Sequence, residues 1–282
     1  MSAVLIDGKQ VAARIRGEVA EAIQNEGISP HLAVILVGDD PASQIYVRNK
    51  ARACRDCGMR STVLRMGADT TQNELEAAID RLNEDKDVDG LMVQLPLPRG
   101  LDAQTALSRI RPEKDVDGLH TVNAGHLFKG EKGIRCCTPA GCMELLRRYV
   151  GEDLTGKNAV VIGRSNIVGK PMAAMLLEAN CTVTVCHSKT RDIADICRRA
   201  DILVCAVGKS RFVTADMVKD GAAVIDVGMN RDENGKLTGD VDFEAAREKA
   251  GYITPVPGGV GPMTIAMLMK NTLEAARNAG KS

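Results

Sequence analysis

Along most of the chain, short apolar runs of strand length alternate with longer amphipathic segments of helix length. In the first part, HLAVILVG (31–38), STVLRM (61–66) and DGLMVQLPLP (89–98) are predicted strands. In the second part, four more strands are predicted at NAVVIG, TVTVCHS, DILVCAVG and AAVIDVG. Helices between strands favour parallel pairing, because each crossover returns the chain to the end of the sheet at which the previous strand began. The sequence therefore predicts an α/β protein.

Two domains are predicted, with their junction in GEKGIRCCTPAG (130–141), a segment rich in glycine that also contains a proline. The first domain is expected to hold residues 1–138, completed by a C-terminal helix at 262–282. The second, residues 139–261, is expected to be a Rossmann-like, doubly wound parallel sheet. A chain of 282 residues is long enough for two modest domains.

The charge balance excludes several classes of partner. Lysine plus arginine equals aspartate plus glutamate, 37 against 37, so nothing draws the whole chain toward nucleic acid or an anionic membrane. Aromatic residues make up 2% and tryptophan is absent, which argues against a surface for base stacking. We find no apolar run of transmembrane length and no signal peptide, and nine scattered cysteines suit reduced core thiols. A cytoplasmic location is expected.

A glycine-rich turn in NAVVIGRSNIVGKPMAAMLLEAN (158–180) marks a candidate dinucleotide site. Gly163 is placed to make the tight turn after a strand, and Gly169 to allow close packing of the next helix. Backbone amides at that helix start, around Val168, would face a pyrophosphate. Ser165 stands where a second glycine is often found, so the pattern alone is a weak signal.

The next strand indicates which nucleotide would bind. NAD sites usually place a carboxylate after this strand to bind the ribose hydroxyls, whereas TVTVCHSKTR ends with Ser188 and Lys189. A hydroxyl there, with Arg164 after the first glycine, suits the 2′-phosphate of NADP. Two polar surface residues on a loop would look the same, and the spacing alone leaves that alternative open.

A second set of polar residues lies in the first half of the chain. Tyr46 and Lys50 are four apart on a predicted helix and share one face, although a lone helical lysine is usually a solvated surface charge. Gln94 follows an apolar strand and would also suit a buried structural amide. Asp115 and Asp117 lie in the second copy of KDVDGL and would also suit a turn before Gly118.

Taken together, five segments resemble the bifunctional methylenetetrahydrofolate dehydrogenase/cyclohydrolase family. The segments occur in the family's order across residues 39–264: DPASQIYVRNK, VQLPLP, PEKDVDGLH, GRSNIVGKP and TPVPGGVGPMT. The resemblance implies that methylenetetrahydrofolate is oxidised by NADP, and that water then opens the methenyl product to 10-formyltetrahydrofolate. It also implies a site in a cleft between the two domains, a homodimer, and a place in one-carbon metabolism and purine biosynthesis.

The resemblance also implies roles for individual residues. Lys50 would move protons during hydrolysis, since desolvation and neighbouring groups can bring the pKa of a lysine toward neutrality. Gln94 would position Lys50, and Tyr46 would pack beside the folate ring. Asp117 would accept hydrogen bonds from the pterin. The second KDVDGL is the one that matches, because only it follows Pro112-Glu113.

Other matching positions are expected to contact the two ligands. In the substrate loop, missing side chains would let the backbone approach the folate. Met229, after DVG, is expected to contact the cofactor together with the glycine-rich turn. The additional substrate contacts expected from the resemblance are Leu95, Pro257, Gly258, Gly259, Val260 and Gly261.

Three alternatives differ in what the site would do. A zinc site is disfavoured, because Cys54 and Cys57 have no matching second pair and the cysteines at 136, 137 and 142 lack paired spacing. A dehydrogenase with little cyclohydrolase activity would not need Lys50, Gln94 and Asp117. A non-enzymatic NADP-binding protein would not need any of the folate-side residues.

Overall fold

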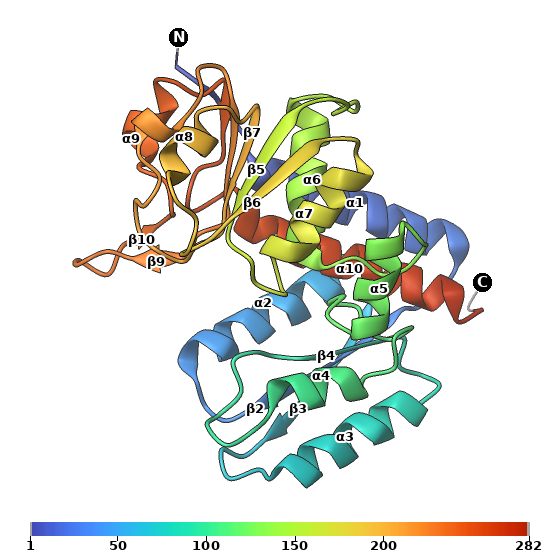
Figure 1. Ribbon diagram of the computed structural model, residues 1–282. Coiled ribbons are helices and arrows are strands. Elements are labelled where there is room, and N and C mark those ends of the chain that lie inside the picture. The colour runs from blue at the N-terminus through green and yellow to red at the C-terminus, as the bar shows by residue number, and fades with distance from the viewer. Residues whose placement is uncertain (1, 281–282) are drawn as a thin grey trace. The chain divides into compact units, whose positions relative to one another are not determined.

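The computed structural model describes residues 2–280, which divide into two compact units (Figure 1). One unit, here called the six-stranded unit, contains residues 2–12 and 138–264. The other, the three-stranded unit, contains residues 13–137 and 265–280. The boundary between them falls inside two long helices, α1 (Gly8–Glu26) and α10 (Val260–Asn278).

The three-stranded unit is built on a parallel sheet in the order β3-β2-β4. Its central strand is buried along its whole length, as expected for a continuous apolar run in a parallel sheet. The strands are β2 (His31–Val37), β3 (Arg60–Met66) and β4 (Gly90–Val93). Four further helices belong to this unit: α2 (Pro41–Asp56), α3 (Gln72–Glu84), α4 (Ala103–Arg109) and α5 (Thr121–Lys129).

Local sequence signals explain where these helices begin. The Asp40 carboxylate accepts a hydrogen bond from Ser43 N at 2.7 Å, and Pro41 is the first residue of α2. Thr71 and Glu74 form a reciprocal capping box at the start of α3. Such a cap stabilises a helix by about 1 kcal/mol. The apolar faces of α3 and α4 then pack on one face of the sheet, around Ile35 and Leu91.

The six-stranded unit is a parallel sheet in the order β1-β11-β8-β7-β5-β6. Figure 1 labels three of its strands, β5, β6 and β7. The chain moves outward from β5 to β6 and then returns to β7 on the other side, so the predicted doubly wound, Rossmann-like topology is confirmed. The strands are β1 (Val4–Leu5), β5 (Asn158–Ile162), β6 (Thr182–Cys186), β7 (Ile202–Cys205), β8 (Ala223–Asp226) and β11 (Tyr252–Ile253).

Helices and a small hairpin complete this unit. One face of the sheet packs against a core that includes residues of α8, α9 and η1. The helices are α6 (Cys137–Tyr149), α7 (Gly169–Glu178), α8 (Ile193–Cys197), α9 (Phe243–Arg247) and the 3-10 helix η1 (Ala215–Met217). The hairpin pairs β9 (Asn230–Arg231) with β10 (Leu237–Thr238).

The structure differs from the expected domain limits at the N-terminus. The first twelve residues were expected in the first domain, but β1 pairs in parallel with β11, so they belong to the six-stranded unit. A strand of two residues carries no pattern that identifies its partner, which lies 248 residues later in the chain. The segment expected as the domain junction and the segment expected as the substrate loop are also partly helical. Thr138–Gly141 lies within α6, and Val260 and Gly261 open α10.

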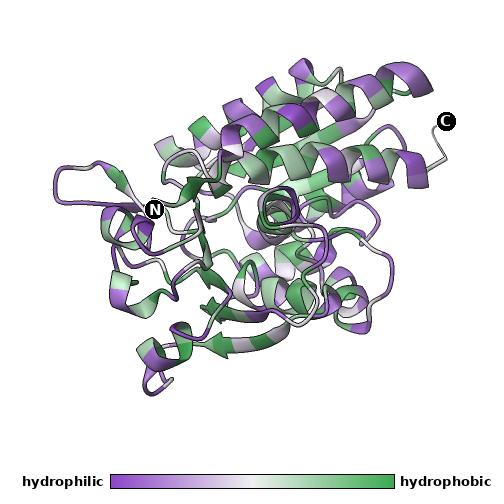
Figure 2. Ribbon diagram, turned by 90° about the horizontal axis from the view of Figure 1, so that it is seen from above, coloured by the Kyte–Doolittle hydropathy of each residue, from purple (hydrophilic) through white to green (hydrophobic). Residues whose placement is uncertain are grey.

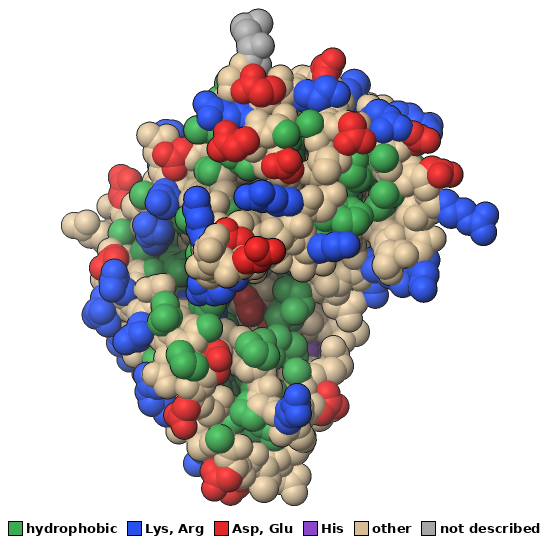
Figure 3. Space-filling model, turned by 90° about the vertical axis from the view of Figure 1, so that its left-hand side faces the viewer, with side chains coloured by type: hydrophobic (Ala, Val, Ile, Leu, Met, Phe, Trp, Pro, Cys, Tyr) green, Lys and Arg blue, Asp and Glu red, His purple; other side chains and the backbone are tan. Residues whose placement is uncertain are grey.

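The distribution of side chains agrees with the composition. Figure 2 shows mainly hydrophobic residues on the strands and alternating character along the long helices. On the face in Figure 3, basic and acidic side chains are interspersed. Within residues 2–280, no helix is both long enough and apolar enough to span a membrane.

Candidate active site

Lys50 is a buried residue of the three-stranded unit, with only 8% of its surface exposed. Its Nζ donates to Gln94 Oε1 at 2.9 Å and lies 3.4 Å from Met92 Sδ. Met92 and Gln94 are two residues apart at the end of β4, so both side chains point to the face that carries α2. The usual interpretation of a helical lysine, a solvated surface charge, is therefore wrong here.

Gln94 is held so that its carbonyl oxygen faces the lysine. Its Nε2 donates to the Leu95 carbonyl at 2.6 Å, which leaves Oε1 as the acceptor for Lys50. Its own backbone N donates to Ile35 O at 2.9 Å, which ties the residue to β2. The amide thus orients the amine without supplying a negative charge that would favour the ammonium form.

Burial lowers the pKa of Lys50 below its ordinary value, and the Asp117 carboxylate and the Cys137 thiol oppose this effect. A lowered pKa increases the fraction of neutral amine near neutral pH. Neutral amine can accept a proton and return it, as a general acid–base catalyst must. The geometry therefore makes Lys50 a candidate for proton transfer.

The two aspartates of the second KDVDGL have different surroundings. Asp115 is 1% exposed and accepts hydrogen bonds from His120 N at 2.7 Å and Asn123 Nδ2 at 3.0 Å. Burial raises the pKa of Asp115 to about 6. Asp117 is only half-buried. Asp115 therefore anchors the loop, whereas the Asp117 side chain is partly accessible to solvent.

The first copy of the hexapeptide has the opposite arrangement. Asp87 is exposed and forms an ion pair with Arg60, whereas Asp89 is buried and accepts a hydrogen bond from His31 N at 2.9 Å. Both carboxylates contribute to local structure around β2 and β3. The two copies of the same hexapeptide therefore have different structural surroundings, as their different flanking residues indicated.

Tyr46 lies one helical turn before Lys50 on α2 and is 39% exposed. Its ring is therefore accessible to a ligand beside the buried amine. Sequence analysis missed two neighbours of this group. Cys137 is a buried thiol close to Lys50. Asn271, far along the chain on α10, donates to Val116 O and Arg135 O, both at 2.9 Å.

The glycine-rich turn of the six-stranded unit needs both of its glycines. Gly163 has φ +124°, and a Cβ there would lie 2.2 Å from Ala206 O. A Cβ on Gly169 would lie 2.2 Å from Gly163 O. The predicted tight turn and close helix packing are therefore present. A cradle of this kind admits a ligand phosphate close to the backbone.

Ser165 explains the departure from the usual glycine pattern. Its Oγ accepts hydrogen bonds from Val168 N at 3.1 Å and Gly169 N at 3.3 Å, so it caps the start of α7. In this structure the serine hydroxyl is therefore the partner of the two amides that were expected to face a pyrophosphate. A second glycine at this position would leave both donors without that partner.

Arg164 and Ser188 both lie beyond the carboxyl ends of neighbouring strands. In the β5–β6 pairing Ile162 is opposite Cys186, and Arg164 and Ser188 each follow two residues later. Both are exposed. The loop carrying Ser188 is held by Lys189 N, which donates to His187 Nδ1 at 3.1 Å. Carboxyl ends of adjacent parallel strands are where dinucleotides bind in this topology.

The Pro257–Gly261 segment packs against the first turn of α1. Gly258 has φ +112°, and its carbonyl accepts a hydrogen bond from Lys9 N at 3.1 Å. A Cβ on Gly8 would lie 1.8 Å from Gly259 O, so only glycine fits there. Met229 is 52% exposed, and its Sδ lies 4.0 Å from where a Cβ on Gly261 would be.

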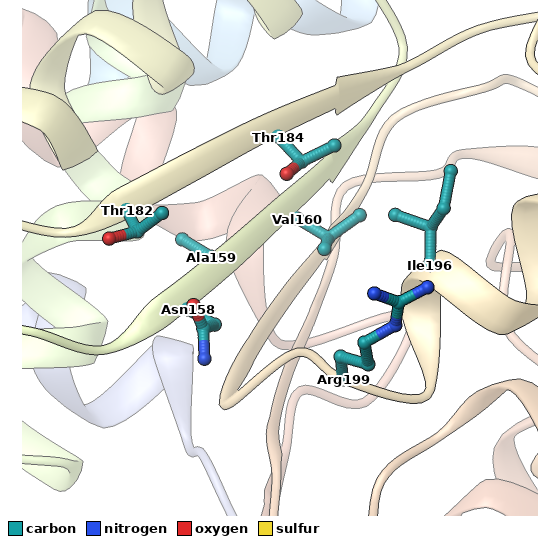
Figure 4. Close-up of a pocket in the computed structure, with 7 residues that line it drawn as sticks. All are labelled: Asn158, Ala159, Val160, Thr182, Thr184, Ile196 and Arg199. Atoms are coloured by element: carbon teal, nitrogen blue, oxygen red, sulfur yellow. The ribbon is translucent and has the colours of Figure 1, made fainter.

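A pocket of about 250 Å³ lies elsewhere on the six-stranded unit (Figure 4). Its lining includes Asn158 and Thr182, the first residues of β5 and β6, and Arg199 after α8. It therefore lies near the amino ends of the strands, away from Gly163, which follows the carboxyl end of β5. Its lining contains no carboxylate, thiol, histidine or lysine for catalysis.

Metal binding and thiol chemistry find no support in the described part of the chain. Residues 2–280 contain no group of three or more His, Cys, Asp or Glu side chains arranged to hold a metal ion. Cys54 and Cys57 are buried near the end of α2. Burial raises the pKa of Cys54 to about 12 and that of Cys57 to about 11, which disfavours the reactive thiolate form.

Comparison with known families accounts for both units. Residues 6–117 match the tetrahydrofolate dehydrogenase/cyclohydrolase catalytic domain, and residues 136–280 match the NAD(P)-binding domain of the same family. The chain belongs to the tetrahydrofolate dehydrogenase/cyclohydrolase family. The resemblance that rested on five short segments is thus confirmed over nearly the whole length.

Individual relatives of this family are similar from end to end. The bifunctional protein FolD of Acidovorax sp. (strain JS42) is 58% identical over 279 residues, which cover 98% of this chain and 99% of the relative. FolD of Moorella thermoacetica is also 58% identical, with 98% and 100% covered.

Solved structures of the family share the fold. The FolD structure from Campylobacter jejuni has a TM-score of 0.95 at 52% identity, with 98% of this chain and 99% of that chain covered. The Trypanosoma brucei dehydrogenase-cyclohydrolase, solved with NADP and an inhibitor, has a TM-score of 0.94 at 44% identity, with both chains fully covered.

Proposed function

We propose that this protein oxidises 5,10-methylenetetrahydrofolate to the 5,10-methenyl form with NADP, and hydrolyses that product to 10-formyltetrahydrofolate. The observation that carries the proposal is the buried Lys50 amine on Gln94 Oε1, in a chain that matches the bifunctional family over both units. A dehydrogenase without hydrolysis would have no use for this buried amine.

The folate side of the reaction is assigned to the three-stranded unit. Tyr46 offers an exposed ring on which the folate can pack, and Leu95 offers a half-buried apolar surface next to Gln94. Asp117 accepts hydrogen bonds from the amino and ring N–H groups of the pterin. Lys50 then transfers protons as water attacks the methenyl carbon and the ring opens.

The cofactor side is assigned to the six-stranded unit. NADP, when bound, accepts the hydride from the methylene carbon. Gly163 and Gly169 allow the tight turn on which its phosphates lie, since a side chain at either would collide with the protein backbone. Arg164 and Ser188 hold the 2′-phosphate, and Val168 and Met229 contact the rest of the nucleotide. Pro257, Gly258, Gly259, Val260 and Gly261 present backbone to the folate.

A direct assay tests this function. The protein is mixed with methylenetetrahydrofolate and NADP, then with NAD, while reduced cofactor and methenyl product are followed together. We expect reduction of NADP to exceed that of NAD, and added methenyltetrahydrofolate to disappear without any nucleotide. Absence of both reactions would contradict the proposed function. Hydrolysis without oxidation, or oxidation without hydrolysis, would remove one of the two activities.

We propose further that the protein acts as a homodimer in the cytoplasm. Strand β6 lies at the edge of its sheet and carries the exposed Val185, and Leu177 on the adjacent α7 is 66% exposed. An unpaired strand edge with apolar neighbours is a surface that a second copy can cover. Nine buried thiols suit a reducing compartment.

Sedimentation of the purified protein tests the dimer. The expected mass is twice the 30.1 kDa of one chain. Leu177→Glu should shift the protein toward the monomer, because a charge would be buried in the proposed contact. The matched control is Phe128→Glu, which changes another exposed apolar residue, on α5 in the other unit. Monomeric wild-type protein at micromolar concentration would refute the dimer.

The Gln94 amide predicts a specific pH effect. In Gln94→Glu a carboxylate faces the Lys50 amine, which favours the ammonium form and raises the pKa of the lysine. Less neutral amine is then present at any pH below that value, so hydrolysis at pH 7 should fall by about tenfold or more. The pH–rate profile of hydrolysis should rise at higher pH than in the wild type. An unchanged profile would argue against neutral Lys50 as the active form.

A further inference from the structure

Two buried carboxylates near the carboxyl ends of the strands of the six-stranded sheet have no part in the proposed function. Asp226 is the last residue of β8 and is 3% exposed, and Asp240 follows β10 and is fully buried. Burial raises the pKa of Asp226 to about 6, so this carboxylate still ionises by neutral pH. The oxygens of both side chains accept several hydrogen bonds inside the unit.

Asp240 binds three consecutive backbone amides of the loop that follows β7. Its Oδ2 accepts from Val207 N at 2.6 Å and Gly208 N at 3.0 Å, and its Oδ1 accepts from Lys209 N at 2.9 Å. The same Oδ1 accepts from Asn230 Nδ2, after β8, at 2.9 Å. One carboxylate thus ties the backbone after β7 to the side chain of Asn230, which follows β8.

Asp226 holds Asp240 in place. Its Oδ1 accepts from Gly228 N and from Asp240 N, both at 2.9 Å, and its Oδ2 accepts from Val241 N at 3.0 Å. A Cβ on Gly239 would lie 1.8 Å from Asp226 Oδ2, so the returning chain packs directly on this carboxylate. The two aspartates, their amide donors and Asn230 form a single network, here called the aspartate network.

The aspartate network lies between the two parts of the proposed site in this unit. In the sheet, β7 and β8 separate β5, which ends at the glycine-rich turn, from β11, which leads to the Pro257–Gly261 segment. Three strand spacings of about 4.8 Å make this separation about 14 Å. A nucleotide with phosphates at Gly163 and its reactive ring directed toward the folate loop has to cross the loops after β7 and β8.

We propose that Asp240, held by Asp226, is a positioning residue for hydride transfer, because it fixes the two loops that support the nicotinamide half of NADP. This inference rests on the proposed function and adds a determinant of one of its two reactions. The physical reason is geometric: displacement of a reacting group by about 1 Å can cost about 100-fold in rate. Hydrolysis, assigned to Lys50 and Gln94 in the other unit, needs no such support.

Asp240→Asn is the discriminating variant. A carboxylate has two acceptor oxygens, whereas an amide has only one. In either orientation of the amide, its NH2 group therefore faces N–H donors that a carboxylate oxygen accepts from in the wild type. We expect kcat for oxidation at saturating NADP to fall about tenfold or more, since the reacting geometry rather than phosphate binding is disturbed. Hydrolysis of added methenyltetrahydrofolate should stay within about twofold of the wild type.

Asp201→Asn is the matched control. The Asp201 carboxylate also accepts a backbone hydrogen bond, from Asn158 N at 2.8 Å, but at the amino ends of the strands. The ratio of oxidation to hydrolysis should stay at the wild-type value in this variant. Equal losses of both activities in Asp240→Asn would indicate a purely structural role, and unchanged oxidation would exclude any role. Either result overturns the inference.

Inactive wild-type protein and a variant that does not fold have different consequences for the inference. Wild-type protein that oxidises no methylenetetrahydrofolate would refute the proposed function itself, independently of the Asp240 variant. If Asp240→Asn does not fold, Asn230→Ala removes a single donor from the aspartate network and applies the same test. It should lower oxidation and spare hydrolysis, and an unchanged ratio of the two activities would overturn the inference.

Discussion

Replacing Lys50 with methionine is expected to abolish hydrolysis of methenyltetrahydrofolate while leaving measurable reduction of NADP. Methionine keeps an unbranched apolar side chain in the buried space and removes only the amine that donates to Gln94. General acid–base catalysis by one side chain contributes about 10²–10⁴-fold to a rate, so hydrolysis should fall by that factor. The measurement is the disappearance of added methenyltetrahydrofolate, with NADPH formation followed separately.

The control for this prediction is Lys86→Met. Lys86 is an exposed lysine of the same unit, in the first copy of the hexapeptide, and the same substitution there should leave both activities unchanged. Thermal unfolding of both variants checks that they fold, because the Gln94 oxygen loses its buried donor in Lys50→Met, at a cost of about 1–3 kcal/mol. Full hydrolysis by a folded Lys50→Met protein would remove this lysine from the mechanism.

Replacing Arg164 with alanine is expected to weaken the use of NADP far more than that of NAD. Arg164 and Ser188 extend beyond paired positions of β5 and β6, so both can reach one phosphate group. A hydrogen bond to a charged group contributes about 1.5–3 kcal/mol, which corresponds to a loss of about 10–100-fold in kcat/KM for NADP. NAD has no 2′-phosphate, and its kcat/KM should change by less than about threefold.

Arg199→Ala is the matched control for the arginine. Arg199 is also an exposed arginine of the six-stranded unit, but it lines the pocket near the first residues of β5 and β6 (Figure 4). Its removal should affect neither nucleotide. Ser188→Ala should act in the same direction as Arg164→Ala, with a smaller effect because a neutral donor is lost. Equal losses for NADP and NAD in Arg164→Ala would contradict the assignment of the 2′-phosphate.

Most helices and strands could be predicted from the local sequence pattern. The strands at 31–37 and 158–162 and the helix beginning at Pro41 follow from apolar runs and a capping residue, which act within a few residues. The tight turn at Gly163 was equally accessible, since a left-handed backbone after a strand favours glycine. The partner of the short strand β1 was not, because β1 pairs with β11, which lies 248 residues later in the chain.

The chemistry of individual side chains was less accessible. By its spacing alone, Lys50 was indistinguishable from a surface lysine. The carboxylates Asp226 and Asp240 attracted no attention, because an aspartate after a strand is an ordinary turn residue. Ser165 was counted as a weakness of the nucleotide motif, whereas its hydroxyl caps the helix that follows.

By itself, the sequence determined the α/β class, the order of the main elements and the family, because these depend on periodicity and on short ordered motifs. Only the tertiary structure decided which polar groups lose contact with water and what they then meet. Lys50 is buried because α2 packs on the sheet and brings the amine to Met92, 42 residues later in the chain, and Asp240 because it meets amides 31–33 residues earlier. Burial is a property of such distant partners, and it is what changes an ordinary lysine or aspartate into a group with a function.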